Sequence, residues 1–268
     1  MRDLRVSIAG ATGWTGRALV TGVLDAPDLT LGSAVSRSAA GRDLGDALGG
    51  EAMGVPVYGS VREALEGIDV LIDFTSATAV KPNALAAIDA GVAVVIGTSG
   101  LTAEDFAQID AAARGRSVGV VASGNFSLTA AICQAAALLA ARHLPQWEVI
   151  DYASASKPDV PSGTARELAE RLGEVRTPDI GRAVDELHGP REARGAAVAG
   201  TQVHSVRLPS FVVSTEVVFG LPDERLTIRH DAGGAPEPYV AGTLIAARRA
   251  PRPVGLTRGL DTLLLAPG

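Results

Sequence analysis

The chain has 268 residues, 47% of them hydrophobic and 4% aromatic, and its formal net charge at pH 7 is −6. This acidic balance excludes the basic stripe that nucleic acids and anionic membranes attract, so we expect neither as a partner. The single Cys133 cannot form a disulfide within the chain, and we find no signal-type leader or run of about 18 apolar residues, so we expect a cytoplasmic protein. No His, Cys or acidic residues have metal-ligand spacing, and no metal is expected.

The beginning of the chain has the pattern of a nucleotide-binding loop. An apolar run over 4–9 predicts a buried strand, and a helix follows it. Between them, Gly10 allows a sharp turn, Gly13 a close approach to a ligand and Gly16 close packing of helix on strand. We therefore expect the pyrophosphate of a dinucleotide at the helix start, held by Gly10, Thr12, Gly13, Trp14, Thr15 and Gly16.

The same glycines permit a second interpretation. Their GxxGxxG spacing differs from the usual GxGxxG, and such a turn can join a strand to a helix without any ligand. Its position after the first strand of an α/β alternation favours dinucleotide binding. Trp14 either covers the pyrophosphate or packs on the protein, and both possibilities stay open.

The second predicted strand, over 29–35, ends without a carboxylate. In dinucleotide-binding folds an Asp or Glu at this position bonds the ribose 2′-hydroxyl and repels a 2′-phosphate. Here Ser36 and Ser38 can donate to phosphate oxygens, and Arg37 can pair with them. We therefore expect NADPH as the cofactor, with NADH possible. The alternative is that Arg37 is a solvated loop charge.

Strands and helices alternate through the rest of the first half. Strands are predicted over 69–74, 92–96 and 118–122, helices over 80–90 and 103–114, and a helical turn over 61–67. This alternation is typical of a Rossmann-type, doubly wound parallel sheet. Ligands of such sheets bind outside the carboxyl ends of the strands, where Phe74 and Thr75 fall.

Past residue 127 the pattern changes. Helices are predicted over 129–142 and 162–172, strands over 147–152, 201–208, 211–219 and 224–230, and an irregular connection over 174–200. The later strands alternate apolar and polar residues, which indicates a mixed or antiparallel sheet with one solvated face. We expect a dinucleotide-binding domain of residues 1–127, completed by 236–268, and an inserted α/β substrate-binding and oligomerisation domain of 128–235.

A second anion site is predicted where the helix over 162–172 begins. Ser162, Gly163 and Thr164 supply hydroxyl and backbone donors at the helix start, and Lys157 adds a positive charge just upstream. A substrate carboxylate fits this combination. The alternative is an ordinary capped helix with a surface lysine.

The chain resembles the dihydrodipicolinate reductase family. Members of this family are reductases of bacterial lysine and diaminopimelate biosynthesis that use NAD(P)H. The resemblance covers nearly the whole length and depends on ordered motifs, namely Gly10–Arg17, Ile72–Thr75, Ile96–Gly100, Asn125–Ser127, Lys157–Ala165, Gly200–Arg207 and Glu224–His230. It implies a Rossmann domain closed by the C-terminal helix, an inserted substrate domain, a small carboxylated substrate and a homotetramer.

The resemblance also implies site residues. Further cofactor contacts are implied at Phe74, Thr75, Gly97, Thr98, Ser123, Asn125 and Phe126, and substrate contacts at Ser154, Lys157, Ser162, Gly163 and Thr164. Bound nicotinamide would deliver hydride to an unsaturated carbon, and Lys157 would act as electrostatic partner or acid.

The chain departs from the family pattern beside Lys157. The family carries a His-His pair there, one member of which is its proton donor, whereas this chain has Ala153 and Ser154. The Ser-Ser-Arg that often follows the counterpart of His230 is replaced at 233–235.

Three interpretations stay open. The chain is a dihydrodipicolinate reductase in which Lys157 or water gives the proton and Ser154 holds a carboxylate. It is a paralogue that reduces another imine, enamine or oxo acid. Or it binds NADPH as a non-catalytic regulatory subunit.

Overall fold

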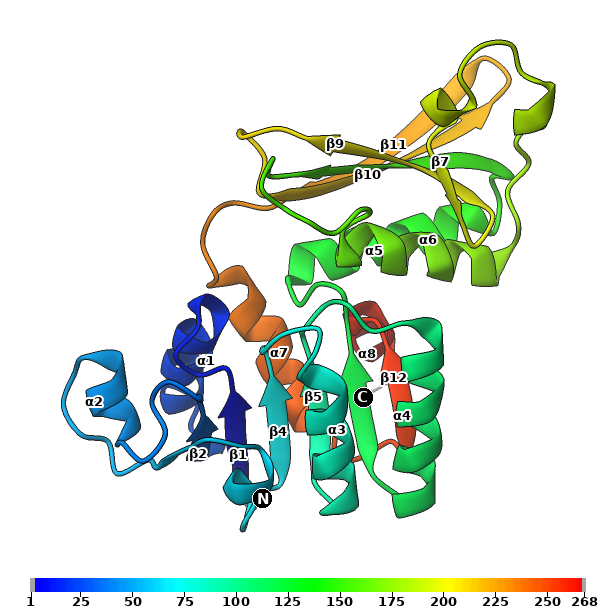
Figure 1. Cartoon of the computed structure of the whole chain (residues 1–268). Coiled ribbons are helices and arrows are strands. Elements are labelled where there is room, and N and C mark those ends of the chain that lie inside the picture. The colour runs from blue at the N-terminus through cyan, green and yellow to red at the C-terminus, as the bar shows by residue number, and fades with distance from the viewer. Residues whose placement is uncertain (1–2, 267–268) are drawn as a thin grey trace. The chain divides into compact units, whose positions relative to one another are not determined.

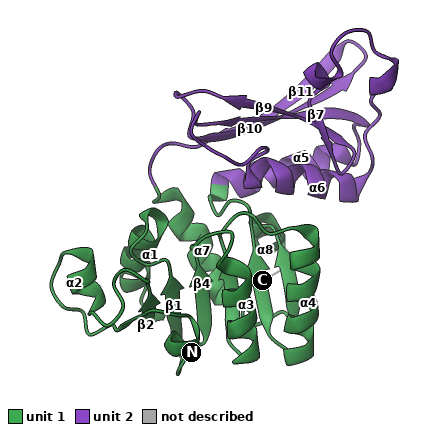
Figure 2. Ribbon diagram, viewed as in Figure 1, with its two compact units in different colours: residues 1–128, 236–268 green, residues 129–235 purple. Residues whose placement is uncertain are grey.

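The structure, a computed structural model, describes residues 3–266. The chain divides into two compact units, which Figure 2 colours separately. Unit 1 comprises the chain up to Leu128 and from Pro236 onward, and unit 2 comprises Thr129–Ala235. Each unit has its own sheet and hydrophobic core. No helix within residues 3–266 has the length and apolar character needed to cross a bilayer.

Unit 1 contains a seven-stranded parallel sheet in the order β12-β6-β5-β4-β1-β2-β3. Its strands are β1 (Leu4–Ala9), β2 (Leu29–Val35), β3 (Val57–Tyr58), β4 (Val70–Asp73), β5 (Ala93–Ile96), β6 (Gly119–Ala122) and β12 (Gly255–Arg258). The central strands β4, β5 and β6 are buried along their whole length, which explains their apolar sequences. The strand order reverses between β1 and β4, and open α/β sheets bind ligands at such a switch point.

Helices cover both faces of this sheet. They are α1 (Trp14–Leu24), α3 (Val80–Asp89), α4 (Ala103–Arg116), α7 (Pro238–Arg249) and α8 (Leu260–Leu265), with a 3₁₀ turn η1 (Arg62–Ala64). The short helix α2 (Leu44–Leu48) lies beyond the edge of the sheet (Figure 1). The pair α3 and α4 packs together on one face, and α1 packs with α7 on the other (Figure 1). The predicted doubly wound fold is therefore confirmed.

Unit 2 contains a mixed five-stranded sheet in the order β11-β10-β7-β9-β8. Its strands are β7 (Gln146–Ala153), β8 (Ala196–Val198), β9 (Thr201–Arg207), β10 (Val213–Leu221) and β11 (Glu224–Asp231). The pair β7 and β9 is parallel and the other pairs are antiparallel, as the alternating patterns predicted.

Two helices, α5 (Leu128–Ala141) and α6 (Gly163–Val175), cover one face of this sheet (Figure 1). Alternate residues of β7, among them Trp147 and Val149, point to that face and pack with Leu168 and Leu172 of α6. The opposite face carries the other half of each strand. Two 3₁₀ turns, η2 (Val184–Glu186) and η3 (Arg191–Arg194), precede β8.

The structure corrects several sequence predictions. The stretch 174–200 is not wholly irregular, because α6 continues to Val175 and β8 pairs with β9. The elements β3, β12 and α8 were missed. They are only two to six residues long, and the two strands form because the edges of β2 and β6 offer unpaired backbone groups.

The packing of the unit 2 core can be tested by its effect on stability. Leu172 is completely buried, so Leu172→Ala should lower the free energy of unfolding by about 2–5 kcal/mol through lost burial and a cavity. Urea unfolding measures this change. The control is Leu139→Ala on α5, because Leu139 is 57% exposed and its loss should cost less than about 0.5 kcal/mol. Equal losses would contradict the assigned core.

Candidate functional site

The turn between β1 and α1 is packed against the end of β4. Gly10 has φ +85°, and a Cβ there would lie 2.2 Å from the carbonyl oxygen of Phe74. A Cβ at Gly16 would lie 2.0 Å from the carbonyl oxygen of Gly10. The backbone of Gly13 donates to that same oxygen at 2.9 Å. Only glycine fits at Gly10 and Gly16, so the turn brings the start of α1 to the switch point.

The start of α1 is suited to an anion. Its N-cap is Gly13, which has no side chain to cap the helix. The N–H groups of the first turn therefore lack a capping side chain, and together with the helix dipole they attract negative charge. Trp14 lies here with 54% of its surface exposed and its ring edge-on to Tyr239, at 6.0 Å between centroids. Thr15 is half-buried.

A pocket of about 670 Å³ lies at the switch point. It is lined by Gly10, Thr12, Gly13, Val35, Ser36, Arg37, Ser38, Gly59, Ser60, Val61, Phe74, Thr75, Ser76, Ala79 and Asn83. The sequence predicted eight of these as cofactor contacts, from three separate segments. It missed Gly59 and Ser60, which follow the two-residue strand β3, and Asn83, which lies in the middle of α3.

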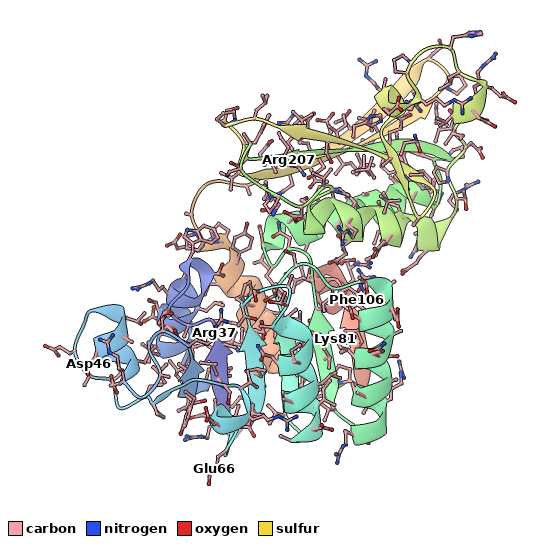
Figure 3. The ribbon with its side chains drawn as sticks, in the orientation of Figure 1. Arg37, Asp46, Glu66, Lys81, Phe106 and Arg207 are labelled. Atoms are coloured by element: carbon pink, nitrogen blue, oxygen red, sulfur yellow. The ribbon has the colours of Figure 1, made fainter. Side chains whose placement is uncertain are left out.

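The pocket is lined by hydroxyl groups where β2 ends. None of its described lining residues is acidic. Thr12 Oγ1 lies 2.8 Å from Ser36 Oγ, which is 3.3 Å from Ser38 Oγ, so a chain of hydroxyls extends from the turn to the end of β2. Arg37 is exposed in this loop, where Figure 3 labels it.

The predicted nicotinamide residues fall on two neighbouring loops. Phe74 follows β4, and its ring lies on Gly97 after β5, where a Cβ would come within 2.1 Å of the ring. The ring also packs on Phe126, with centroids 5.9 Å apart. The backbone of Thr75 donates to Thr98 Oγ1 at 2.8 Å. The structure therefore brings these five residues together.

Ser123 and Asn125 shape the next loop, after β6. Ser123 Oγ donates to the carbonyl oxygen of Asn125 at 2.8 Å, and Asn125 Oδ1 accepts from the backbone of Ser127 at 2.8 Å. Both side chains thus stabilise the loop that carries Phe126 beside Phe74.

In unit 2 a buried ion pair holds the predicted substrate loop. Asp151 is completely buried in β7, and its Oδ2 accepts from Arg207 Nη2 at 2.8 Å and from Ser205 Oγ at 3.0 Å. The same oxygen accepts from the backbone of Ser162 at 2.9 Å. Arg207 also donates to the carbonyl oxygen of Asp159 at 2.8 Å. Figure 3 labels Arg207 at the end of β9.

This ion pair fixes the start of α6. Ser162 is its N-cap, and its hydroxyl accepts from the backbone of Ala165 at 3.3 Å. Gly163 and Thr164 form the first turn of the helix, so the predicted cluster of donors exists. The sequence assigned Asp151 no role, and only the spatial pairing of β7 with β9 reveals it.

Lys157 lies in the loop that precedes α6. Its Nζ is 2.9 Å from Asp159 Oδ1, and its side chain is 27% exposed. The loop begins at Ser154, whose carbonyl oxygen accepts from the backbone of Lys157 at 3.0 Å and whose Oγ is 3.0 Å from Ser156 Oγ. Ala153 is completely buried at the end of β7.

Comparisons with known proteins match the chain in two parts that meet at residue 126. Sequence models described as "Dihydrodipicolinate reductase, N-terminus" and "Dihydrodipicolinate reductase, C-terminus" match residues 4–126 and 126–264. The chain belongs to the dihydrodipicolinate reductase family.

Relatives of this reductase match along its whole length. The 4-hydroxy-tetrahydrodipicolinate reductase of Desulfitobacterium hafniense is 36% identical over 267 residues, covering 98% of this chain and 100% of that protein. The one from Thermosynechococcus vestitus is 37% identical over 268 residues, covering 97% of each. A solved structure, the dipicolinate-bound dihydrodipicolinate reductase of Paenisporosarcina sp. TG-14, matches with a TM-score of 0.75 at 28% identity, over 97% of this chain and 99% of that one.

These findings confirm the predicted reaction class. The reductase is an NAD(P)H-dependent oxidoreductase of lysine and diaminopimelate biosynthesis, and it acts on a small carboxylated substrate. Neither a different substrate nor a non-catalytic role is favoured by any of the relatives.

The contribution of the Asp151–Arg207 ion pair to stability can be tested by substitution. Arg207→Met leaves Asp151 buried without its cation, so the free energy of unfolding should fall by about 3–5 kcal/mol. Chemical denaturation measures the loss. The control Arg225→Met removes an exposed arginine of β11 in the same sheet, and we expect a change below about 0.5 kcal/mol. If Arg207→Met were as stable as the control, the pair would not support the loop.

Proposed function

We propose that this reductase uses NADPH to reduce the dihydrodipicolinate formed from 4-hydroxy-tetrahydrodipicolinate, despite lacking the histidine pair. The observation that carries this proposal is the full-length relationship to proteins named for that substrate, together with the pocket at the switch point. When bound, the cofactor supplies a hydride from C4 of its nicotinamide to an unsaturated carbon. The chain's own residues hold the ligands and provide the accompanying proton.

The pocket of unit 1 supports the cofactor assignment. The narrow turn at Gly10 and Gly16 and the uncapped start of α1 would hold the pyrophosphate. The nicotinamide end would lie against Phe74, Gly97 and Thr98. The hydroxyl chain and Arg37, with no carboxylate among the lining residues, favour the 2′-phosphate of NADPH over the bare ribose of NADH.

This preference can be tested by reversing the charge at Arg37. Arg37→Asp should raise the Kd for NADPH about 10-fold to 100-fold, because a charge-assisted contact becomes a repulsion, and should leave NADH binding largely unchanged. Separate fluorescence titrations with the two cofactors measure it. Arg42→Asp is the matched control, since Arg42 is exposed in the same loop but does not line the pocket. Tighter binding of NADH than of NADPH by the unaltered protein would refute the preference.

Unit 2 supports a carboxylate site at the start of α6. Ser162, Gly163 and Thr164 provide donors at the helix start, and Lys157 provides the positive charge. Ala153 and Ser154 have no acidic proton to give, so we assign proton delivery to Lys157 or to water held by it. Its partner Asp159 would keep the ammonium in place until a substrate carboxylate arrives.

The assay that tests the function uses substrate made in situ from aspartate semialdehyde and pyruvate by the matching synthase, with NADPH oxidation followed by absorbance. We expect turnover by the unaltered protein. Lys157→Met should lower kcat/KM by about 10²-fold to 10⁴-fold, the usual contribution of a general acid.

The control for this substitution is Lys81→Met, which removes the lysine of α3 that pairs with Asp105; it should retain activity. Absence of turnover by the unaltered protein, with NADPH still bound, would instead assign it another small imine or oxo acid.

We further propose a cytoplasmic homotetramer formed through unit 2. The face of its sheet opposite α5 and α6 carries Ile150 and Val218 beside a pocket of about 700 Å³. Glu148 in this pocket contacts both His204 and Arg194, so its carboxylate charge is paired. A face with an apolar centre and satisfied charges is suited to contact with a second copy.

A further inference from the structure

Asp73 is the last residue of β4 and is completely buried. It lies within the motif Ile72–Thr75, but the sequence assigned it no role and it does not line the pocket. Its Oδ1 accepts from the backbone of Thr75 at 3.0 Å, from Thr75 Oγ1 at 2.7 Å and from Thr98 Oγ1 at 2.8 Å. Its Oδ2 accepts from Asn83 Nδ2 at 2.8 Å. All four contacts are donations to the carboxylate, so it acts only as an acceptor.

A buried carboxylate is strongly unfavourable unless other donors replace the lost water. Here none of the four donors is a cation, and they come from three segments: the loop after β4, the loop after β5 and the helix α3. The carboxylate therefore links segments that are separate in the sequence. If one of them moves, the remaining donors no longer satisfy the buried charge.

The linked loops are the ones that carry the predicted nicotinamide contacts. Phe74 lies between Asp73 and Thr75, and Gly97 precedes Thr98. The carbonyl oxygen of Asp73 also accepts from the backbone of Gly97 at 3.0 Å. The ring of Phe74 rests on Gly97 with no space for a Cβ between them. A small shift of either loop would therefore move the Phe74 ring away from Gly97 or make the two clash.

We propose that Asp73 is a positioning residue, which fixes the loops after β4 and β5 so that they bind the nicotinamide end of the cofactor. This inference rests on the proposed function, because it takes the cofactor to be NADPH bound at the switch point. Asp73 does not touch the ligand in this account. It acts through Thr75, Thr98 and Asn83, and its contribution is confined to one end of the cofactor.

Two ligands distinguish this role from a general loss of stability. NADPH contains the nicotinamide, whereas 2′-phospho-ADP-ribose keeps the adenosine, the 2′-phosphate and the pyrophosphate but lacks it. In Asp73→Asn the new amide places a donor against a donor, either at Asn83 or at Thr75. We expect Asp73→Asn to weaken NADPH binding by about tenfold or more and 2′-phospho-ADP-ribose binding by less than about twofold.

Two further variants sharpen the test. Asn83→Asp combined with Asp73→Asn exchanges the two side chains and restores an amide facing a carboxylate, so the double variant should bind NADPH better than either single variant. The control Ser33→Ala removes a buried hydroxyl that bonds Ala64 and Ser7, away from the pocket. It should lower the thermal midpoint while changing the affinities for both ligands equally and by less than about twofold.

The outcomes separate the two proposals. If the unaltered protein binds neither ligand, the proposed cofactor site is wrong and this inference falls with it. If the unaltered protein binds both ligands and reduces the substrate, but Asp73→Asn weakens both ligands equally or neither, only the inference is overturned. Selective loss of NADPH affinity, with recovery in the double variant, supports it.

Discussion

At the carboxyl ends of β1 and β4, the backbone of Gly10 lies against the carbonyl group of Phe74, with no room for a Cβ between them. This contact sets the position of the turn that begins α1, because Gly13 and Gly16 are packed on the carbonyl oxygen of Gly10. It also sets the position of Phe74, whose ring reaches across to Gly97. A single close approach at the switch point thus places the start of α1 and the loop after β4 around one pocket.

In unit 2 a buried charge, rather than a close backbone contact, holds a loop in position. The loop that precedes α6, which is the predicted substrate loop, has little regular structure, and it is held by the buried Asp151 rather than by backbone pairing. The carboxylate binds the start of α6 directly and, through Arg207, the loop that contains Asp159 and Lys157. The proposed carboxylate site depends on this arrangement, because it combines Lys157 with the donors at the start of α6.

The loss of the family's histidine pair is compatible with this arrangement. Ala153 is buried at the end of β7, and Ser154 forms a hydrogen bond within its own loop. The end of the strand is therefore packed and hydrogen-bonded without the two histidines. In the proposed function, hydride transfer depends on how the two ligands are held, whereas a general acid contributes a limited factor that Lys157 or water would supply in part. The chain therefore belongs to the family although Ala153 and Ser154 stand where the resemblance implies a histidine pair.

From the sequence alone, the buried strands, the three glycines after β1 and the family motifs determined the fold class and the reaction class. The same features and the lysine loop predicted residues for both sites. These features are local, since each depends on a strand end or a helix start that periodicity reveals. Tertiary structure alone decided the roles of Asp73, Asn83 and Asp151, and the existence of β3, β8 and β12. A buried carboxylate acquires its function from donors far away in the chain, and a two-residue strand exists only beside a neighbour. Neither the buried carboxylate nor the short strand produces a periodic pattern in the sequence, because both depend on partners that folding brings together.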